Sequence, residues 1–438
     1  MATDGALARL REQLAQPVDA SGTAFVRFAF GGVLAFSAIR FWAKGWIEEL
    51  YLVPSYHFAY PGFEWVTAHP PWGLHAHFAV MAIAALLFAL GIAYRASALV
   101  LFLTFTWVEL IDQTYYLNHY YLVSLMLALA CVLRLDRRDT VPRVVPVILR
   151  AQLAIVYFYA GVAKLDSDWL LRAEPLRTWL FAHSDVPLIG TWLQPASVAF
   201  ALAWVGALFD LSIALLLCLP KTRLLAYLAV VGFHVATGLL FPIGVFPLVM
   251  IALTTVFFPH DWPRALLERL GRPRVARPTP AAALPLAAPA TLALAVYLAL
   301  QVLIPLRHVG YPGAVNWTEE GFRFAWRVML IEKTGHVELR VVDRATGQRF
   351  TVDPRDELSA RQVAIMSTQP AMIIQYARHV GERFAQRGHR NVAVYADAFT
   401  SLNGRRTQRL LDPGYDLAAP RSALAAHPAI TQLGDSQL

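Results

Sequence analysis

The sequence predicts an all-α polytopic membrane bundle of about nine transmembrane helices, followed by a small α+β extracytoplasmic C-terminal domain. Of the 438 residues, 57% are hydrophobic and only 16% are charged, and the mean hydropathy is +0.47. A soluble domain carries about 25% charged residues, so this composition indicates a chain that lies largely in lipid. The net charge of +8 does not indicate nucleic-acid binding, because the basic residues lie in connections between apolar segments.

The distribution of apolar residues divides the chain into three regions. Residues 1–21 are polar and predict a cytoplasmic segment without a cleaved signal peptide. Residues 22–306 predict the transmembrane domain, with a Pro/Ala-rich linker at 271–290 before its last span. Apolar stretches of roughly membrane length lie at about 22–42, 75–94, 97–111, 120–133, 144–164, 198–219, 222–241, 243–258 and 291–306.

The basic residues of the connections predict how the bundle is oriented. If the N-terminus is cytoplasmic, fourteen Lys and Arg residues fall on the inner side and only four on the outer side before the last span. The four outer residues are Lys44, Lys164, Arg172 and Arg177. The sequence therefore predicts a multi-pass cell-membrane protein, in the inner membrane if the host is a bacterium, with its C-terminal region outside.

Residues 307–438 differ in composition and predict a compact α+β domain. Two hairpins are expected from strands that alternate apolar and polar residues. Their strands lie at 336–343 with 348–354, and at 391–399 with 405–412. Between the hairpins, residues 369–387 have the apolar spacing of an amphipathic helix.

The segment 152–169, QLAIVYFYAGVAKLDSDW, carries the most distinctive residues of the chain. An apolar helix of membrane length ends there at Lys164, and Arg150, Tyr157 and Lys164 recur at intervals of seven along one helix face. The lysine has two interpretations. It is either a snorkelling side chain that anchors the helix at the interface, or a partly desolvated amine that acts as a base.

Ionisable residues within apolar spans are costly and are therefore functional candidates. These residues are Arg27, Arg40, Glu109, Asp112, Asp210 and His234. The structural alternative is that acids and arginines pair across helices, and Arg27 or Arg40 could supply the partner that Asp210 needs.

Asn118 and His119 open a predicted span on the same side of the membrane as Lys164. A neutral imidazole there can exchange protons near pH 7, or it is a histidine simply satisfied at the interface. His75 and His77 lack an evident third ligand, so no metal site is expected.

The segment VYFYAGVAKLDSDW at 156–169 resembles the lysine-bearing segment of the vitamin K-dependent gamma-carboxylase family, whose members are HTTM-domain membrane proteins. Further similar segments follow in order over nearly the whole chain. They are Asp112 with Asn118-His119, DLS at 210–212, the sequence around His234, NWTEEGFRFAW at 316–326 and SLNGRRTQRLLDPGYD at 401–416. Animal members have a second lysine where this chain has Ala163. They also continue into a large C-terminal region that helps to bind the propeptide of the substrate, whereas this chain ends at Leu438.

The resemblance implies an enzyme that couples epoxidation of reduced vitamin K, a phylloquinol- or menaquinol-type naphthoquinone, by O2 to carboxylation of glutamate with CO2. It implies that Lys164 takes a proton from the quinol and that His119 assists at the quinone oxygens. The other residues expected around the quinone or substrate are Asn118, Asp112, Tyr157, Asp210, His234 and Trp326.

The expected partners are the lipid bilayer, a lipophilic quinone and a glutamate-containing peptide or protein, with no metal and no nucleic acid. Two other functions stay open. One is a quinol epoxidase or oxidase without glutamate carboxylation, and the other is a non-enzymatic membrane scaffold or transporter.

Overall fold

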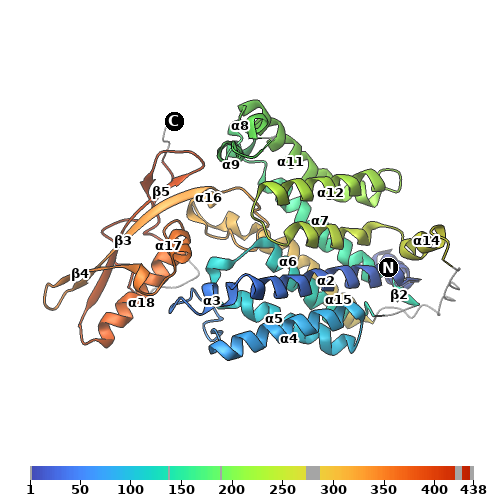
Figure 1. The fold of residues 1–438 in the computed structure, drawn as a ribbon, viewed down its shortest axis with the longest axis horizontal. Coiled ribbons are helices and arrows are strands. Elements are labelled where there is room, and N and C mark those ends of the chain that lie inside the picture. Colours follow the sequence, from blue (N-terminus) through green and yellow to red (C-terminus); the bar gives the residue numbers. More distant parts are fainter. Residues whose placement is uncertain (1, 137–138, 188–189, 273–286, 420–426, 435–438) are drawn as a thin grey trace.

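The computed structural model describes the chain except for residues 1, 137–138, 188–189, 273–286, 420–426 and 435–438. A helical bundle forms most of the molecule, and a four-stranded sheet domain lies at one end of it (Figure 1). The N-terminus lies at the opposite end of the bundle, beside β2 and α14. The linker expected at 271–290 falls mainly outside the described residues.

Within the described residues, seven helices are long and apolar enough to cross a membrane. They are α2 (Ser21–Ala43), α4 (Pro71–Leu90), α5 (Tyr94–Ile111), α7 (Val144–Ala163), α11 (Ala196–Cys218), α12 (Arg223–Leu240) and α15 (Ala288–Leu303) continued by η3 (Ile304–Gly310). The other two predicted spans are shorter apolar helices, α6 (Asn118–Val132) and α13 (Phe246–Thr254) continued by η2 (Thr255–Phe257). The 15 residues of α6 rise only about 22 Å, less than the roughly 30 Å of hydrocarbon. The predicted membrane bundle is therefore present, but a count of nine complete spans is not confirmed.

Shorter elements connect these helices. They are α1 (Ala2–Ala15), α3 (Trp46–Tyr51), η1 (Gln113–Tyr115), α8 (Ser167–Arg172), α9 (Leu176–Ala182), α10 (Gly190–Leu193), α14 (Trp262–Arg269), α16 (Val315–Thr318) and the paired strands β1 (Pro17–Asp19) and β2 (Thr140–Pro142).

Helix α7 is the most enclosed of the seven long helices, with 67% of its apolar stretch buried within the protein. It packs closely against α11 at Gly161, where a Cβ atom would lie 2.7 Å from Cγ of Leu211. Small residues allow such close approach of two helix backbones in a membrane. This contact sets α11 directly beside the last turn of α7.

Partly buried arginines of the bundle bind helix ends. Arg150 donates hydrogen bonds to the carbonyls of Val256 and Phe258, at 2.8 and 3.0 Å, and Arg27 donates to the carbonyl of Ala89 at 3.3 Å. These carbonyls lie at or just beyond the C-terminal ends of η2 and α4, where the backbone acceptors have no partner within their own helix. Arg27 also donates to the carbonyl of Leu135 at 3.0 Å.

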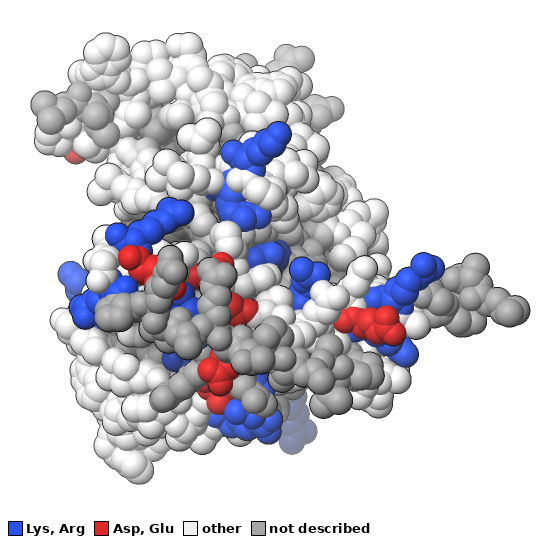
Figure 2. All heavy atoms as spheres, turned by 90° about the vertical axis from the view of Figure 1, so that its right-hand side faces the viewer, with Lys and Arg blue, Asp and Glu red and all other residues white. Residues whose placement is uncertain are grey.

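The end of the bundle farthest from the sheet domain carries many basic side chains. Figure 2 shows this face, which carries Lys and Arg side chains with Asp and Glu among them. Arg264 contacts Asp19 there at 3.2 Å, and Arg134 contacts Asp136 at 2.8 Å. The face corresponds to the inner side that the sequence predicts.

The sheet domain confirms both predicted hairpins and the predicted amphipathic helix. Its strand order is β4-β3-β5-β6, and every neighbouring pair is antiparallel. The elements are β3 (Lys333–Asp343), β4 (Arg349–Val352), η4 (Pro354–Asp356), α17 (Ala360–Met366), α18 (Pro370–Gln386), β5 (Val392–Leu402) and β6 (Gln408–Arg409). Helix α18 buries its apolar side, including Ile373 and Tyr376, against the sheet. The turn between β5 and β6 begins at Asn403 and points toward α8.

Candidate active site

A cavity of about 330 Å³ lies around the end of α7 that carries Lys164. Its walls come from α6, α7, α8, α9, α11, α12, α13 and the segment 326–329, and most of the lining is apolar. The volume is at the lower end of the roughly 300–1,000 Å³ of small-molecule pockets. Leu202 and Val205 of α11 line the cavity and are also 39% and 57% exposed. The cavity therefore reaches the apolar outer surface of the bundle.

Lys164 and Asp210 form an ion pair in the wall of this cavity. The lysine caps the C-terminal end of α7, and its Nζ donates to Oδ2 of Asp210 at 2.7 Å. The two residues are only 4% and 6% exposed. The Trp169 ring covers the same ammonium, with its centroid 5.2 Å from Nζ.

This pair corrects the sequence-based suggestion that Arg27 or Arg40 is the partner of Asp210. The close approach of α7 and α11 at Gly161 explains the pairing, because Gly161 lies three residues before Lys164 and contacts the neighbour of Asp210. Lys164 is thus buried and bonded to a carboxylate in the described structure. It does not reach outward to the interface as a snorkelling side chain does.

Three buried ring nitrogens in the cavity wall have no hydrogen-bond partner within the described protein. They are Nε2 of His119, Nδ1 of His234 and Nε1 of Trp326. The other nitrogen of His234, Nε2, lies 3.1 Å from the hydroxyl of Tyr157. Buried polar groups are nearly always hydrogen-bonded, so these nitrogens indicate a ligand that carries polar atoms.

The segment that presents Trp326 has an unusual backbone. Phe324, Trp326 and Met329 have φ values of 64°, 55° and 58°, a left-handed conformation that is uncommon for bulky residues. Strain of this kind persists where surrounding contacts impose it, and it is often found at functional sites. The side-chain amide of Asn118 supplies one such contact by donating to the carbonyl of Arg327 at 3.2 Å. Asn118 therefore lines the cavity and also holds this segment in place.

Asp112 lies apart from the residues that line the cavity. Its carboxylate accepts hydrogen bonds from Gln362 of α17 at 2.7 Å and from the hydroxyl of Thr114 at 2.7 Å, and it contacts His57 at 3.2 Å. These contacts join the outer end of α5 to the sheet domain. The structure thus brings Lys164 together with the other expected site residues but places Asp112 in a separate interface.

No group of three or more His, Cys, Asp or Glu side chains suited to a metal ion occurs in the described part of the chain. His75 contacts Glu48 at 2.9 Å, and His77 bonds to the carbonyl of Thr104 at 2.8 Å.

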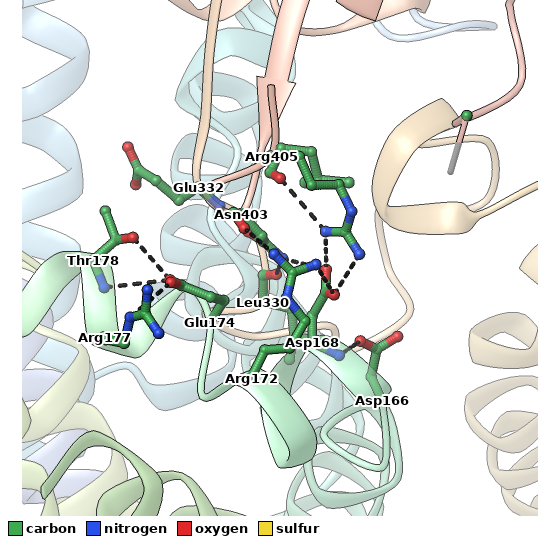
Figure 3. A network of polar contacts seen from close by, with 12 residues as sticks. Asp166, Asp168, Arg172, Glu174, Arg177, Thr178, Leu330, Glu332, Asn403 and Arg405 are labelled. Carbon is green, nitrogen blue, oxygen red and sulfur yellow. Dashed lines mark hydrogen bonds and ion pairs between the residues drawn. The ribbon is translucent and has the colours of Figure 1, made fainter. Parts of the chain in front are cut away.

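Sequence reasoning missed a polar network at the edge of the cavity (Figure 3). The carboxylate of Asp168 accepts a hydrogen bond from each terminal nitrogen of Arg405, both at 2.6 Å. It also accepts from the side-chain amide of Asn403 at 3.1 Å and from Arg172 at 3.2 Å. Burial alone would raise the pKa of Asp168, but the hydrogen bonds from Arg405 and Asn403 outweigh burial and hold it below its usual value. The sequence did contain a clue to this network, because Asp168 and Arg405 each lie in a segment that resembles the gamma-carboxylase family.

Two family models match consecutive parts of the chain. The HTTM domain model matches residues 15–262, which contain Lys164 and most of the cavity. The model of the vitamin K-dependent gamma-carboxylase lumenal domain matches residues 287–435, which contain Trp326, Asn403 and Arg405. No solved structure matches the chain. The first model covers most of the membrane bundle and the second covers the sheet domain, and together they match more than half of the sequence. The chain therefore belongs to the vitamin K-dependent gamma-carboxylase family.

Proposed function

We propose that this protein is a membrane gamma-carboxylase-like enzyme that couples epoxidation of a reduced naphthoquinone by O2 to carboxylation of glutamate by CO2. The observation that carries this proposal is the buried pair of Lys164 and Asp210 in a cavity that also presents three unpartnered ring nitrogens. The two family models support the same assignment.

The residues of the cavity fit reduced vitamin K. Apolar walls suit a naphthoquinone ring, and N–H groups of His119, His234 and Trp326 suit its two oxygens. When bound, the quinol supplies, through its oxidation by O2, the driving force for removing a glutamate γ-proton, a step beyond any side-chain base. The exposed lining at Leu202 and Val205 gives such a lipid-soluble molecule a path from the bilayer.

The protein side chains hold and move protons in this proposal. Nζ of Lys164 first passes a proton to Oδ2 of Asp210, 2.7 Å away, and the neutral amine then takes the quinol proton. Asp210 also fixes the position of Nζ, and the pair leaves no isolated charge in the bundle. In this proposal the Tyr157 hydroxyl donates to Nε2 of His234, 3.1 Å away, and the proton of that ring is on Nδ1. His119 provides a second nitrogen in the cavity wall, where a preorganised donor stabilises an oxygen that becomes negative.

The proposed topology follows the sequence-based regions. Residues 1–21 lie in the cytoplasm, residues 22–306 form the membrane domain and residues 307–438 lie outside. The match of the C-terminal region to a lumenal domain, and the basic face at the opposite end (Figure 2), support this orientation. A glutamate-containing peptide would then approach from the side of the sheet domain.

One observation favours the alternative of a quinol epoxidase or oxidase without carboxylation. Lys164 is the sole Lys or Arg among the described residues that line the cavity, and its ammonium is already paired with Asp210. A glutamate carboxylate therefore meets no second cation there.

The deciding experiment uses the purified protein in lipid, with reduced vitamin K, O2, labelled bicarbonate and a glutamate-containing peptide. Quinone epoxide and fixed label are measured separately, with Lys164→Ala compared with Lys44→Ala, a matched change at an exposed lysine. We expect both products from the native protein and from Lys44→Ala, and neither from Lys164→Ala. Epoxide without fixed label would establish the alternative. Full epoxide formation by a folded Lys164→Ala protein would overturn both.

A further inference from the structure

We propose that Asp168, Asn403 and Arg405 form a positioning knot that couples the sheet domain to the Lys164 site, so that quinol oxidation and glutamate carboxylation stay linked. The knot joins the α8 helix, the β5–β6 turn and the segment that leads out of the cavity wall (Figure 3). None of its three residues lines the cavity, so each acts through a neighbour.

Asp168 and Arg405 form a bidentate ion pair between α8 and the sheet domain. Both terminal nitrogens of the guanidinium donate to the carboxylate at 2.6 Å, one to each oxygen. Such two-fold pairing fixes direction as well as distance. The carboxylate side chain is 8% exposed, so solvent screens this pair much less than a surface pair.

Asn403 ties the third element into the knot. Its amide nitrogen donates to Asp168 and to the carbonyl of Leu330, both at 3.1 Å, and its amide oxygen accepts from the backbone of Glu332 at 2.9 Å. The residue is fully buried, with a left-handed φ of 49°. Met329, just before Leu330, lines the cavity.

The contacts continue from the knot to the reactive lysine. Trp169 follows Asp168 in α8, donates to the carbonyl of Ala203 at 2.7 Å and covers Nζ of Lys164 with its ring. Arg172, one turn later, donates both to Asp168 and to the carbonyl of Asn403. The β5–β6 turn therefore determines where the Trp169 ring and Met329 stand relative to Lys164.

This geometry gives the knot a positioning role, because its residues do not line the cavity where the reaction is proposed to occur. Quinol oxidation takes place within the bundle, whereas a peptide substrate approaches past the sheet domain, an assignment that rests on the proposed function. Loss of the knot should then weaken the coupling of glutamate carboxylation to quinol oxidation more than it slows quinol oxidation itself. Displacements of about 1 Å in such supports can lower rates about 100-fold.

The test compares Arg405→Gln with Arg409→Gln in the full-length protein in lipid. Arg409 is a matched control, because it lies on the same hairpin and pairs with Asp397 at 2.6 Å inside the sheet domain. Hydrogen exchange of residues 167–172 and 328–332 is measured together with the ratio of epoxide to fixed label. We expect Arg405→Gln to speed exchange in both segments and to raise the product ratio about ten-fold or more, with β3 and α18 unchanged.

A second variant keeps the proposal testable if Arg405→Gln does not fold. Arg405→Lys retains the charge but cannot pair with both oxygens of Asp168 at once, so its exchange and product ratio should lie between those of the native protein and Arg405→Gln. Equal exchange and an equal ratio in the Arg405 and Arg409 variants would overturn the knot, as would faster exchange with an unchanged ratio. If the native protein fixes no label, the proposed carboxylation fails, whereas exchange at 167–172 still decides whether the knot holds α8.

Discussion

Nζ of Lys164 lies 2.7 Å from Oδ2 of Asp210, and both side chains are almost completely enclosed by the bundle. A buried ion pair contributes little net stability, but removing one partner leaves an isolated charge and costs about 3–5 kcal/mol. The two residues should therefore behave as one unit in mutagenesis.

We expect Lys164→Met to lose both activity and stability, and Lys164→Met/Asp210→Asn to regain stability alone. The double variant removes both charges, so it should recover the roughly 3–5 kcal/mol of unfolding free energy that the single variant loses. Quinol turnover stays reduced by about 100- to 10,000-fold, the usual contribution of a general base. Thermal unfolding in detergent and epoxide formation measure the two effects. An active double variant would contradict the role of Lys164.

The contact of α7 with α11 predicts opposite outcomes for two glycines. Gly161→Ala places a Cβ 2.7 Å from Leu211, so the helices must separate, at about 1–3 kcal/mol. Gly232→Ala meets no atom within 4 Å and should be neutral or slightly stabilising in its helix. Thermal unfolding compares the two variants. Equal stability would mean that Gly161 does not determine the spacing of the helices.

Filling the cavity should block quinone binding without unfolding the bundle. A Cβ at Gly206 would lie 3.7 Å from the Trp169 ring, an ordinary contact, so Gly206→Ala should bind normally. Gly206→Phe places a ring inside the cavity. A thermal shift caused by added menaquinone reports binding directly, and we expect this shift in Gly206→Ala and its loss in Gly206→Phe. A retained shift in the phenylalanine variant would place the quinone elsewhere.

The Tyr157 hydroxyl should act through the orientation of His234. Tyr157→Phe preserves the ring but removes the 3.1 Å hydrogen bond to Nε2, so the imidazole no longer has one fixed tautomer. We expect turnover to fall by about ten-fold, the equivalent of about 1.4 kcal/mol, and stability to fall by about 1–3 kcal/mol because Nε2 of His234 loses its buried partner. Steady-state kinetics with the quinol varied provide the measurement. Turnover equal to that of the native protein would remove His234 from the site.

Acid should loosen the sheet domain through Asp168. Its pKa is lower in the folded protein than the unfolded value of about 3.9. Its contribution is thus complete above the unfolded value and is lost as the pH falls through the folded one. The stability difference between the native protein and Asp168→Asn should stay constant from pH 7 to about pH 5 and shrink below about pH 4. Thermal unfolding at several pH values measures it, and a difference that grows in acid would reverse the assigned sign.

The sequence predicted those parts of the architecture that depend on patterns among neighbouring residues. Apolar length located the spans, two-residue alternation located β3 to β6, and 3.6-residue spacing located α18. The number of complete spans was less certain, because α6 and η2 end their helices after too few residues to cross the hydrocarbon. Sequence hydropathy does not distinguish a short apolar helix from a span of full length.

Segments that resemble a family also predicted that Lys164, His119, His234 and Trp326 surround one ligand, and in the structure all four line one cavity. Pairing needed the tertiary structure. The sequence suggested that Arg27 or Arg40 could be the partner of Asp210, because charge alone cannot choose between distant cations. The packing of Gly161 against α11 instead brings Lys164 to Asp210. The same reason applies to Asp168 and Arg405, which are 237 residues apart. Residue type determined which groups need partners, and the approach of particular backbones decided which partners they have.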